Sequence, residues 1–518
     1  MPPLCSNTHF PYSDPCHNHS GKGESLLAKT LHRVFLVGFS LLWGWLFVNS
    51  VLRWRHNGAA ALAAGLGLAA LFFLLAKFTA PRLDRLSPKA FRLGFGLAFA
   101  LYAALFCWLA WLLAEVPIMD LEVVLRTLPE LLADGHFTLW NGYYIVCNNN
   151  LGLALVLGGW YKLAGIFGFV PGADLAGVAP GIALNTLAIL SSVALVCLLA
   201  RRLFRSNGAV ALAFVLCAGF APFVLYAPTF YSDTLSLPFA LLALLAWSRY
   251  RTEPRPGCRL ALLACMSAAA FFGYAVKGSV VVVLAALIIQ LFLEKGGKQA
   301  AKAALALVLC FGLLFGSYRA WQRLSFIDWA EEDALALPLT LWFCYGSHDE
   351  GNYSQADFDA AMSVDTLAER KALLNARLVQ TYRSYSPVQL AEFMTQKAAI
   401  TWGDGLYDAP EFLATPQRAN WTHRFILEGQ PGYMPLVYYC QAYLYMLQLL
   451  ILAGAVLAAV KNISPNPLTL TRLCLVGLVL FLSFWETKSR YAFNFTPLLL
   501  LLALEFLLFL SHKKAVDV

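Results

Sequence analysis

The segment FWETKSRYAFNFTP, residues 484–497, joins two apolar runs near the end of the chain, at about 467–485 and 491–511. Each run is long enough to cross the hydrocarbon core of a bilayer as a helix, which takes about 20 apolar residues. A short connector needs only small polar residues, but this one carries four large polar side chains: Glu486, Lys488, Arg490 and Tyr491. The segment therefore predicts a membrane fold and a polar site at one face of the membrane.

The composition of the whole chain agrees with a membrane protein. The 518 residues are 59% hydrophobic and 13% charged, whereas soluble domains carry about 25% charged residues. The formal net charge of +8 comes mostly from basic loops beside apolar runs, a pattern that orients membrane proteins and does not indicate nucleic acid. The 12 cysteines are scattered, many inside apolar runs, so no disulfide framework is expected.

The apolar runs predict an all-α fold, a polytopic membrane helix bundle of about twelve spans with extracytoplasmic surface helices. The spans are expected at 34–52, 58–79, 93–115, 180–200, 209–228, 232–249, 259–275, 278–293, 300–320, 435–459, 467–485 and 491–511.

Basic residues give the expected orientation, because cytoplasmic loops carry an excess of Lys and Arg. With the N-terminus in the cytoplasm, six basic clusters fall inside: 81–92, 201–205, 249–259, 295–302, 461–472 and 512–514. Arg53 and Arg55 are the main exceptions. Two long segments, 116–179 and 321–434, and the loop at 486–491 then lie on the extracytoplasmic face of the plasma membrane.

The apolar segment LGLALVLGGWYKLAGIFGF, residues 151–169, is not counted as a span. Counting it would reverse every later loop and place the basic cluster at 201–205 outside. It also contains Lys162 and several glycines, which suit an interfacial or re-entrant helix packed against protein.

This orientation divides the chain into consecutive parts: a cytoplasmic tail at 1–31, two accessory membrane helices at 32–92, a membrane core at 93–320 with its first outer loop at 116–179, an extracytoplasmic domain at 321–434, and membrane helices with a short cytoplasmic tail at 435–518. The spacing of five residues in the first tail matches no standard metal site: Cys5, His9, Cys16, His17 and His19. We expect no cofactor and no metal site, and a requirement for a divalent metal stays open.

The first outer loop begins with a predicted amphipathic helix that Asp120 can cap. Apolar residues recur there at a spacing of three and four: Leu121, Val124, Leu125, Leu128, Leu131 and Leu132. Such a stripe is typical of a helix on the membrane surface. Pro129 is expected to kink or split the helix, and Gly135 to end it.

The outer domain is expected to be small and helical. One amphipathic helix covers about 364–382, and a second begins at Ser386, a capping serine followed by proline, and continues to about 400. The segment WGDGLYDAP, residues 402–410, is rich in turn formers and predicts a loop.

Polar side chains gather at the outer ends of several predicted spans. They are Glu115, Asp120 and Glu122 after the third span, Tyr231, Ser232 and Asp233 between the fifth and sixth, Tyr274 and Lys277 between the seventh and eighth, and Glu486, Arg490 and Tyr491 before the last. If the helices form one bundle, these patches converge on a single outward-facing site.

A carboxylate near two positively charged side chains suits a substrate that has a phosphate and a hydroxyl group needing deprotonation. Arg490 can bind phosphate oxygens through paired hydrogen bonds, and Lys277 can act as a point charge. A carboxylate such as that of Asp120 can serve as general base towards a hydroxyl. The positive charges of Lys277 and Arg490 would also stabilise negative charge on a leaving phosphate.

Each of these residues also has a structural interpretation. Asp120 and Asp233 can cap helices, and Lys277 can extend from a span end to the interface. Glu486 and Arg490 have the i,i+4 spacing of an ion pair.

Two further acids lie at or inside predicted spans. Glu505 lies within the last apolar run, where an ionisable residue indicates a functional or interhelical role, but its depth is towards the cytoplasm, so it is left out of the site. Glu115 can simply mark the membrane boundary.

Four motifs occur in order along the chain: PIMDLE at 117–122 in a long outer loop, RRLFR at 201–205 after the next span, YSDTLSLP at 231–238 before a later span, and ETKSRYAFNFTP at 486–497 before the last helix. This layout resembles the GT-C class of integral-membrane glycosyltransferases, in particular the bacterial relatives of protein mannosyltransferases and of the aminoarabinose transferase that modifies lipid A. The resemblance covers about residue 93 to the end.

The resemblance implies an inverting transfer of a sugar from a polyprenyl-phosphate donor to an extracytoplasmic glycan, lipid or protein. It gives the role of base, or of acceptor-positioning group, to the acid of the first outer loop. This chain has Asp120-Leu-Glu122 where many relatives have adjacent Asp-Glu, so either carboxylate is a candidate. The residues that would bind the donor phosphate or sugar are Lys277, Arg490, Tyr491, Glu486, Asp233 and Tyr231.

Other classes of membrane protein are alternatives. A transporter or flippase for lipid-linked sugars is expected to place ionisable groups along the middle of the membrane and often to have repeated halves. The sequence shows no obvious internal repeat, and apart from Glu505 its predicted spans are nearly free of charge. A polysaccharide polymerase or ligase also uses lipid-linked sugars outside the membrane, and the acid of the first outer loop favours GT-C over it. A non-catalytic scaffold would tolerate Asp120→Asn.

Overall fold

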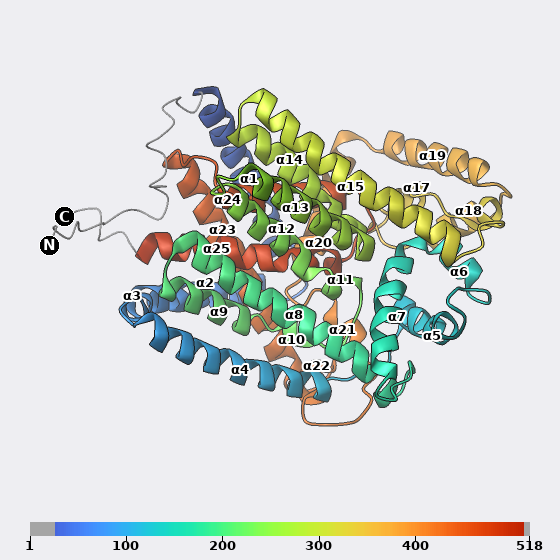
Figure 1. Ribbon diagram of the computed structural model, residues 1–518, viewed down its shortest axis with the longest axis horizontal. Helices are drawn as coiled ribbons and strands as arrows, with labels where there is room; N and C mark the ends of the chain where they lie inside the picture. The colour runs from blue at the N-terminus through green and yellow to red at the C-terminus, as the bar shows by residue number, and fades with distance from the viewer. Residues whose placement is uncertain (1–25, 512–518) are drawn as a thin grey trace.

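The computed structural model describes residues 26–511, and this part of the chain consists of helices and loops, as expected of an all-α protein. Its one isolated β-bridge, between Glu115 and Pro416, joins two loops. The long helices run side by side in a bundle, and a group of shorter helices lies at one end of it (Figure 1).

Within the described residues, 9 helices are long and apolar enough to cross a membrane. The corresponding elements are α1 (Leu26–Leu52), α2 (Gly58–Phe78) with α3 (Ala80–Asp84), α4 (Pro88–Leu112), α8 (Leu175–Phe204), α13 (Pro256–Val276), α15 (Gly297–Ser325), α23 (Tyr433–Val460), α24 (Pro467–Phe484), and η4 (Ser489–Phe495) with α25 (Thr496–Ser511). These helices agree with the predicted polytopic bundle.

The other three expected spans, at 209–228, 232–249 and 278–293, contain only shorter helices. They are α9 (Asn207–Gly219), α10 (Pro222–Leu225), α11 (Ser232–Leu235), α12 (Leu237–Tyr250), η3 (Gly278–Val281) and α14 (Val282–Glu294). Pro222 breaks the first of these regions, because its ring and missing N–H prevent α9 from continuing. Apolar length alone therefore overestimated the helices here, and the interruptions bring polar residues to the ends of the bundle.

The first outer loop contains the predicted amphipathic helix, α5 (Met119–Asp134). Ile118 occupies its N-cap position, so the prediction that Asp120 caps this helix is wrong, and Asp120 lies in the first turn. The helix continues through Pro129 and is not split. Gly135 ends it with a φ of 77°, the left-handed conformation that glycine adopts without strain.

Three further elements complete this loop: α6 (Asn141–Val146), η2 (Asn148–Asn150) and α7 (Leu151–Gly165). α7 has 15 residues and is not among the helices long enough to span. It packs against α5, α8 and α13. The apolar stripe of α5 is buried in part against α7, so this face of the helix meets protein.

The second outer segment is helical, as predicted. Its elements are α16 (Glu332–Leu335), α17 (Thr340–Tyr345), α18 (Gln355–Met362), α19 (Leu367–Ser384), α20 (Pro387–Trp402), α21 (Ala409–Phe412) and α22 (His423–Ile426). The start of α20 is the predicted one: Ser386 accepts from the backbone of Gln389, whose side chain accepts in return. Of these helices the sequence predicted only α19 and α20.

The two outer segments lie together at one end of the bundle, where α5, α6 and α17 to α19 are grouped (Figure 1). Phe137 N–H donates to the Phe326 carbonyl at 2.9 Å, and the Asn141 amide donates to the Asp328 carbonyl at 2.7 Å. The start of α1 and the end of α25 lie towards the opposite end (Figure 1). Both long segments therefore share one side of the bundle.

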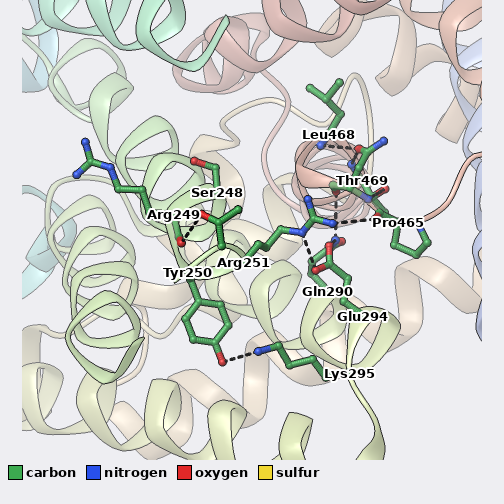
Figure 2. Close-up of polar contacts among 12 residues, drawn as sticks. Ser248, Arg249, Tyr250, Arg251, Gln290, Glu294, Lys295, Pro465, Leu468 and Thr469 are labelled. Carbon is green, nitrogen blue, oxygen red and sulfur yellow. Dashed lines mark hydrogen bonds and ion pairs between the residues drawn. The ribbon is translucent and has the colours of Figure 1, made fainter. Parts of the chain in front are cut away.

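Polar contacts tie helices together at the C-terminal ends of α12 and α14 (Figure 2). Arg251 pairs with Glu294 at 2.9 Å, and Gln290 donates to the same carboxylate at 2.6 Å. Lys295 donates to the Tyr250 hydroxyl at 3.0 Å (Figure 2). These contacts join the C-terminal ends of α12 and α14, and further hydrogen bonds connect them to Pro465 and Asn466 in front of α24.

Glu505 forms a buried ion pair with Arg472 of α24. The pair joins the last two helices, so of the two roles predicted for Glu505, functional or interhelical, the structure shows the interhelical one. Breaking such a buried pair by removing one partner is costly, because the other charge is left without a counterion.

Candidate functional site

Three predicted residues from three separate elements meet at the end of the bundle that carries the outer segments. Asp233 lies in the first turn of α11, Lys277 follows the last residue of α13, and Arg490 lies in η4. Lys277 forms an ion pair with Asp233, and Nη1 of Arg490 lies 3.6 Å from Oδ2 of the same carboxylate. Two cations thus share one anion.

These charges are largely removed from solvent. The side chain of Asp233 is 2% exposed and that of Lys277 is 11% exposed, and that of Arg490 is 13% exposed. Nε of Arg490 and Oδ2 of Asp233 are buried and make no hydrogen bond within the described residues. The guanidinium therefore keeps donor capacity for a further acceptor.

Aromatic rings surround the two cations. The guanidinium carbon of Arg490 lies 5.6 Å from the ring centre of Tyr231, 5.4 Å from that of Phe412 and 5.2 Å from that of Tyr491. Nζ of Lys277 lies 4.9 Å from the ring centre of Tyr491. These rings attract the cations and limit the access of water. The attraction between each cation and the Asp233 carboxylate is stronger as a result.

Glu486 joins this cluster through Tyr491, whose hydroxyl donates to its carboxylate at 2.9 Å. Burial raises the pKa of the Glu486 carboxyl, and the hydrogen bond from Tyr491 and the charge of Arg490 oppose that rise. No ion pair between Glu486 and Arg490 is found in residues 26–511, so their spacing was a misleading signal. The chain between them is not α-helical, and four residues do not make one turn there.

Asp120 lies beside the cluster and receives tyrosine hydroxyls at both of its oxygens. The Tyr143 hydroxyl lies 3.3 Å from Oδ1, and the Tyr231 hydroxyl lies 3.2 Å from Oδ2. Because the ring of Tyr231 also faces Arg490, this one side chain connects the acid to the basic residues. Met119, directly before Asp120, has a φ of 55°, a strained conformation for a residue with a Cβ atom.

Glu122 does not reach the cluster. Its carboxylate pairs with Arg126 one turn later at 2.5 Å, and its side chain is 36% exposed. Of the two candidate acids, Asp120 and Glu122, the geometry brings only Asp120 to the other predicted residues.

Sequence reasoning missed an asparagine in this cluster. Asn150 is buried, its amide donates to the Tyr143 hydroxyl at 2.8 Å, and its carbonyl oxygen lies 3.1 Å from the Tyr231 hydroxyl. The available signal was the run of three asparagines at 148–150 in front of an apolar helix.

The loop at 402–410 also belongs to the site, although its turn formers alone drew attention to it. Asp408 accepts from the backbone N–H of Arg490 at 3.2 Å, and Asp404 accepts from the Ser489 hydroxyl at 2.8 Å. Burial and the neighbouring Asp408 raise the pKa of Asp404. Asp408 has a φ of 59°, so this loop too carries local strain.

Lys397 of α20 fastens the outer domain to the loop before η4. Its ammonium group donates to the carbonyls of Gly346 at 2.5 Å and Trp485 at 2.7 Å. Burial lowers the pKa of Lys397 to about 7. Nothing in the sequence distinguished this lysine from the other polar residues of the same helix, such as Gln389 and Glu392.

A separate cavity of about 220 Å³ lies in the outer domain between α17 and α19, and its lining includes His348, Asp357 and Arg377. These charges satisfy one another, since His348 contacts Asp357 at 2.7 Å and Arg377 contacts it at 2.5 Å. In residues 26–511, no group of three or more His, Cys, Asp and Glu side chains is arranged to hold a metal. The five Cys and His residues of the first tail lie outside the described residues.

Two comparisons with known proteins bear on the chain. A search of the curated proteins finds no match. A family model described as conserved hypothetical integral membrane protein matches residues 28–508, which include the bundle, both outer segments and every residue of the cluster. The chain therefore belongs to the family of conserved hypothetical integral membrane proteins.

Proposed function

We propose that this protein is a membrane glycosyltransferase, which transfers a sugar from a polyprenyl-phosphate donor to an extracytoplasmic glycan, lipid or protein with inversion at the sugar carbon. The observation that carries this proposal is the junction at Tyr231: its hydroxyl touches the Asp120 carboxylate, and its ring faces Arg490. A candidate base and a candidate phosphate site therefore lie on two sides of one side chain.

The donor phosphate would bind at Arg490 and Lys277. Nε of Arg490 has no acceptor among the described residues, and its contact to Asp233 is long, at 3.6 Å. A phosphate can take up this donor capacity in charge-assisted hydrogen bonds. Asp233 then acts as a positioning residue, which keeps the two cations side by side when no donor is bound.

The acceptor would bind on the Asp120 side. Asp120 takes the proton of an acceptor hydroxyl, whose oxygen attacks the sugar carbon as the bond from that carbon to the phosphate oxygen breaks. The bond electrons leave with the polyprenyl phosphate, and Lys277 and Arg490 stabilise the resulting charge. Attack opposite the leaving group gives the inverted product.

Backbone strain at the cluster supports a functional role. Met119, Tyr407 and Asp408 all have a positive φ, between 55° and 59°, and all three lie within the cluster or directly beside residues of it. Left-handed conformations at residues other than glycine are costly and persist where the surroundings fix them, often at active sites.

The location of the cluster suits a lipid-linked donor. It lies where the membrane helices meet the outer segments, so a headgroup can reach it while the polyprenyl chain stays in the bilayer. The distribution of basic loops in the sequence supports an extracytoplasmic location for this end. We therefore propose a multi-pass plasma membrane enzyme with an extracytoplasmic active site.

The test is a donor panel applied to the purified protein in nanodiscs, with transfer or slow hydrolysis of each polyprenyl-phosphate sugar as the readout. The wild type is compared with Asp120→Asn, which is expected to lose about 10²–10⁴-fold in rate while donor affinity is kept. Glu122→Gln is the matched control, since this acid lies outside the cluster, and it should stay near the wild-type rate.

Two results would contradict the proposal: turnover of no donor in the panel, or a near-normal rate for a folded Asp120→Asn protein. Turnover restricted to oligosaccharides on a polyprenyl diphosphate would instead identify a polymerase or ligase.

A further inference from the structure

A second group of polar side chains lies beside the candidate site and has no role in the mechanism above. Arg319, near the outer end of α15, donates through Nη1 to Oδ1 of Asn148 at 3.0 Å and to Oε1 of Gln322 at 3.0 Å. Its guanidinium carbon lies 5.7 Å from the ring centre of Trp329. Two segments far apart in the sequence, at 148 and at 319–329, thus contribute to this group.

The group contains buried donors without an acceptor. Nδ2 of Asn148 and Nε1 of Trp329 are both shielded from solvent and make no hydrogen bond within the described residues. A buried N–H without a partner is costly, and most such groups in proteins are paired. Both orphan atoms are donors, so the group that would satisfy them is an acceptor.

The charge of Arg319 is also not balanced. Among residues 26–511 no carboxylate forms an ion pair with it, whereas Arg323, one turn later, pairs with Glu332 at 2.8 Å. Arg323 lies over the same ring, 5.0 Å from the centre of Trp329. Two arginines over the same ring therefore differ in having a counterion.

This group is continuous with the candidate site through the three asparagines of η2. Asn148 contacts Arg319, the Asn149 amide donates to the Asn150 carbonyl oxygen at 3.2 Å, and Asn150 contacts the Tyr231 hydroxyl. Tyr231 in turn contacts Asp120. The group thus lies on the Asp120 side, where the acceptor would bind.

We propose that Arg319, Asn148 and Trp329 form a subsite for an anionic oxygen group, a phosphate or a carboxylate, carried by the acceptor. A cationic ligand does not fit, because both unsatisfied atoms, Nδ2 of Asn148 and Nε1 of Trp329, are donors, and no carboxylate among residues 26–511 pairs with Arg319. A guanidinium presents a planar fork of donors that matches either anion. That the ligand is the acceptor rests on the proposed function; that the subsite takes an anion does not.

The anion is tested by ¹⁹F NMR of protein labelled with 5-fluorotryptophan, in nanodiscs of phosphatidylcholine, with the Trp329 resonance assigned by Trp329→Phe. Three probes are used at constant ionic strength: sodium phosphate, sodium glucuronate, and phosphatidic acid added to the nanodisc lipid. A saturable shift of this resonance is expected with at least one probe, and the probe that gives it identifies a free phosphate, a sugar carboxylate or a lipid headgroup as the source.

The matched variants are Arg319→Gln and Arg323→Gln, which remove one arginine each from the same ring. Arg319→Gln should weaken the affinity about tenfold or more, since it removes charge-assisted hydrogen bonds, and Arg323→Gln should leave it within about twofold. Arg319→Lys keeps the charge without the fork and should fall between. The inference is overturned if no probe gives a saturable shift, or if folded Arg319→Gln binds as tightly as the wild type.

Donor affinity, measured on the same samples, separates this inference from the proposed function. Arg319→Gln should bind polyprenyl-phosphate sugars as the wild type does, because the donor site lies at Arg490 and Lys277. Anion binding at Trp329 in a protein that binds and transfers no sugar would contradict the proposed function and leave the subsite in place. Sugar transfer without anion binding at Trp329 would contradict the subsite and leave the proposed function in place.

Discussion

The Tyr231 hydroxyl lies 3.2 Å from Oδ2 of Asp120, although the two residues come from different regions of the chain. Its single hydrogen is shared with Oδ1 of Asn150, at 3.1 Å. The carboxylate is thereby held in one orientation, with tyrosine hydroxyls at both oxygens. This contact leads to the first prediction.

Tyr231→Phe removes the hydroxyl and keeps the ring over Arg490. The Asp120 carboxylate then loses one of the groups that orient it, so the turnover number should fall about tenfold, within the range for a hydrogen bond to a charged group, while donor affinity stays unchanged. Steady-state kinetics on one donor check this. Tyr231→Ala, which also removes the ring, should weaken the donor as well; equal effects of both variants on donor affinity would refute the division of roles.

Arg490→Ala should weaken donor binding by about tenfold or more, because charge-assisted hydrogen bonds contribute about 1.5–3 kcal/mol. Arg490→Lys should keep part of the affinity, having the charge without the fork. Glu486→Gln is the companion variant, measured for donor affinity and thermal stability together. If Arg490→Ala and Glu486→Gln lower only stability, and the folded fraction binds donor normally, the loop at 486–491 is a structural clasp.

Asp233→Asn removes the carboxylate that Lys277 and Arg490 share. Two buried cations are then left facing each other, and the loss of one member of a buried ion pair costs on the order of 3–5 kcal/mol. The midpoint of thermal unfolding should fall clearly without donor. Added donor should restore more stability to this variant than to the wild type, because its phosphate replaces the missing charge; an equal gain in both would count against a phosphate at this position.

Glu115 should make the protein less stable as the pH rises. Both of its carboxylate oxygens are buried without a hydrogen bond, and burial raises its pKa from 4.5 to about 8. Between these values the folded chain keeps a proton that the unfolded chain has lost, so this stability is complete below about pH 4.5 and is lost as the pH rises through about 8. Glu115→Gln, always neutral, should raise the melting midpoint at pH 8 and flatten its dependence on pH.

The control for that experiment is Glu122→Gln. Glu122 is partly exposed and paired with Arg126 at the surface, so this change should leave the pH dependence as it is in the wild type. Parallel slopes for the wild type and Glu115→Gln would show that this carboxyl is not protonated in the folded protein.

The orientation is checked by labelling single cysteines in a cysteine-free background. Ala356→Cys, on exposed α18, should react with a membrane-impermeant maleimide on intact cells, and Lys461→Cys, after α23, should react only after permeabilisation. Both positions are exposed in the structure. Labelling of both residues from the same side would overturn the predicted orientation and the exclusion of 151–169 from the spans.

The main features of the site followed from the sequence because charge is rare in this chain. Lys277 and Arg490 stand at the ends of long apolar runs, and a charged residue at that depth points to a specific partner. Their contact with Asp233 could be predicted only on the assumption of a single helix bundle, since the sequence of a span does not show which helices pack beside it. Two local interpretations failed: Asp120 does not cap α5, and the ion pair offered as the structural alternative for Glu486 and Arg490 does not form, because the segment between them is not α-helical.

Other members of the cluster lacked a sequence signal strong enough to find them. Asn150 and Tyr143 are uncharged polar residues at helix starts, where caps and turns are the common explanation. Lys397 lies in an amphipathic helix among other polar residues, and only the packing of α20 against η4 shows that it is buried. In each case the role comes from a contact between distant segments, which periodicity along one segment does not encode.

The contacts of Lys397 have a consequence for how variation in this family should be read. Its ammonium group connects the segment after α17 with the loop before η4, and Thr487 of that loop donates its N–H to the Gly351 carbonyl at 2.6 Å. A Cβ atom on Gly351, whose φ is 76°, would lie 2.3 Å from the Thr487 hydroxyl. A mutational scan scored by the proposed transferase activity should therefore be sensitive to Gly351, although this residue lies outside the cluster. Within the family, Gly351, Lys397 and Thr487 should be inherited as a set, and the outer domain should diverge fastest away from this junction.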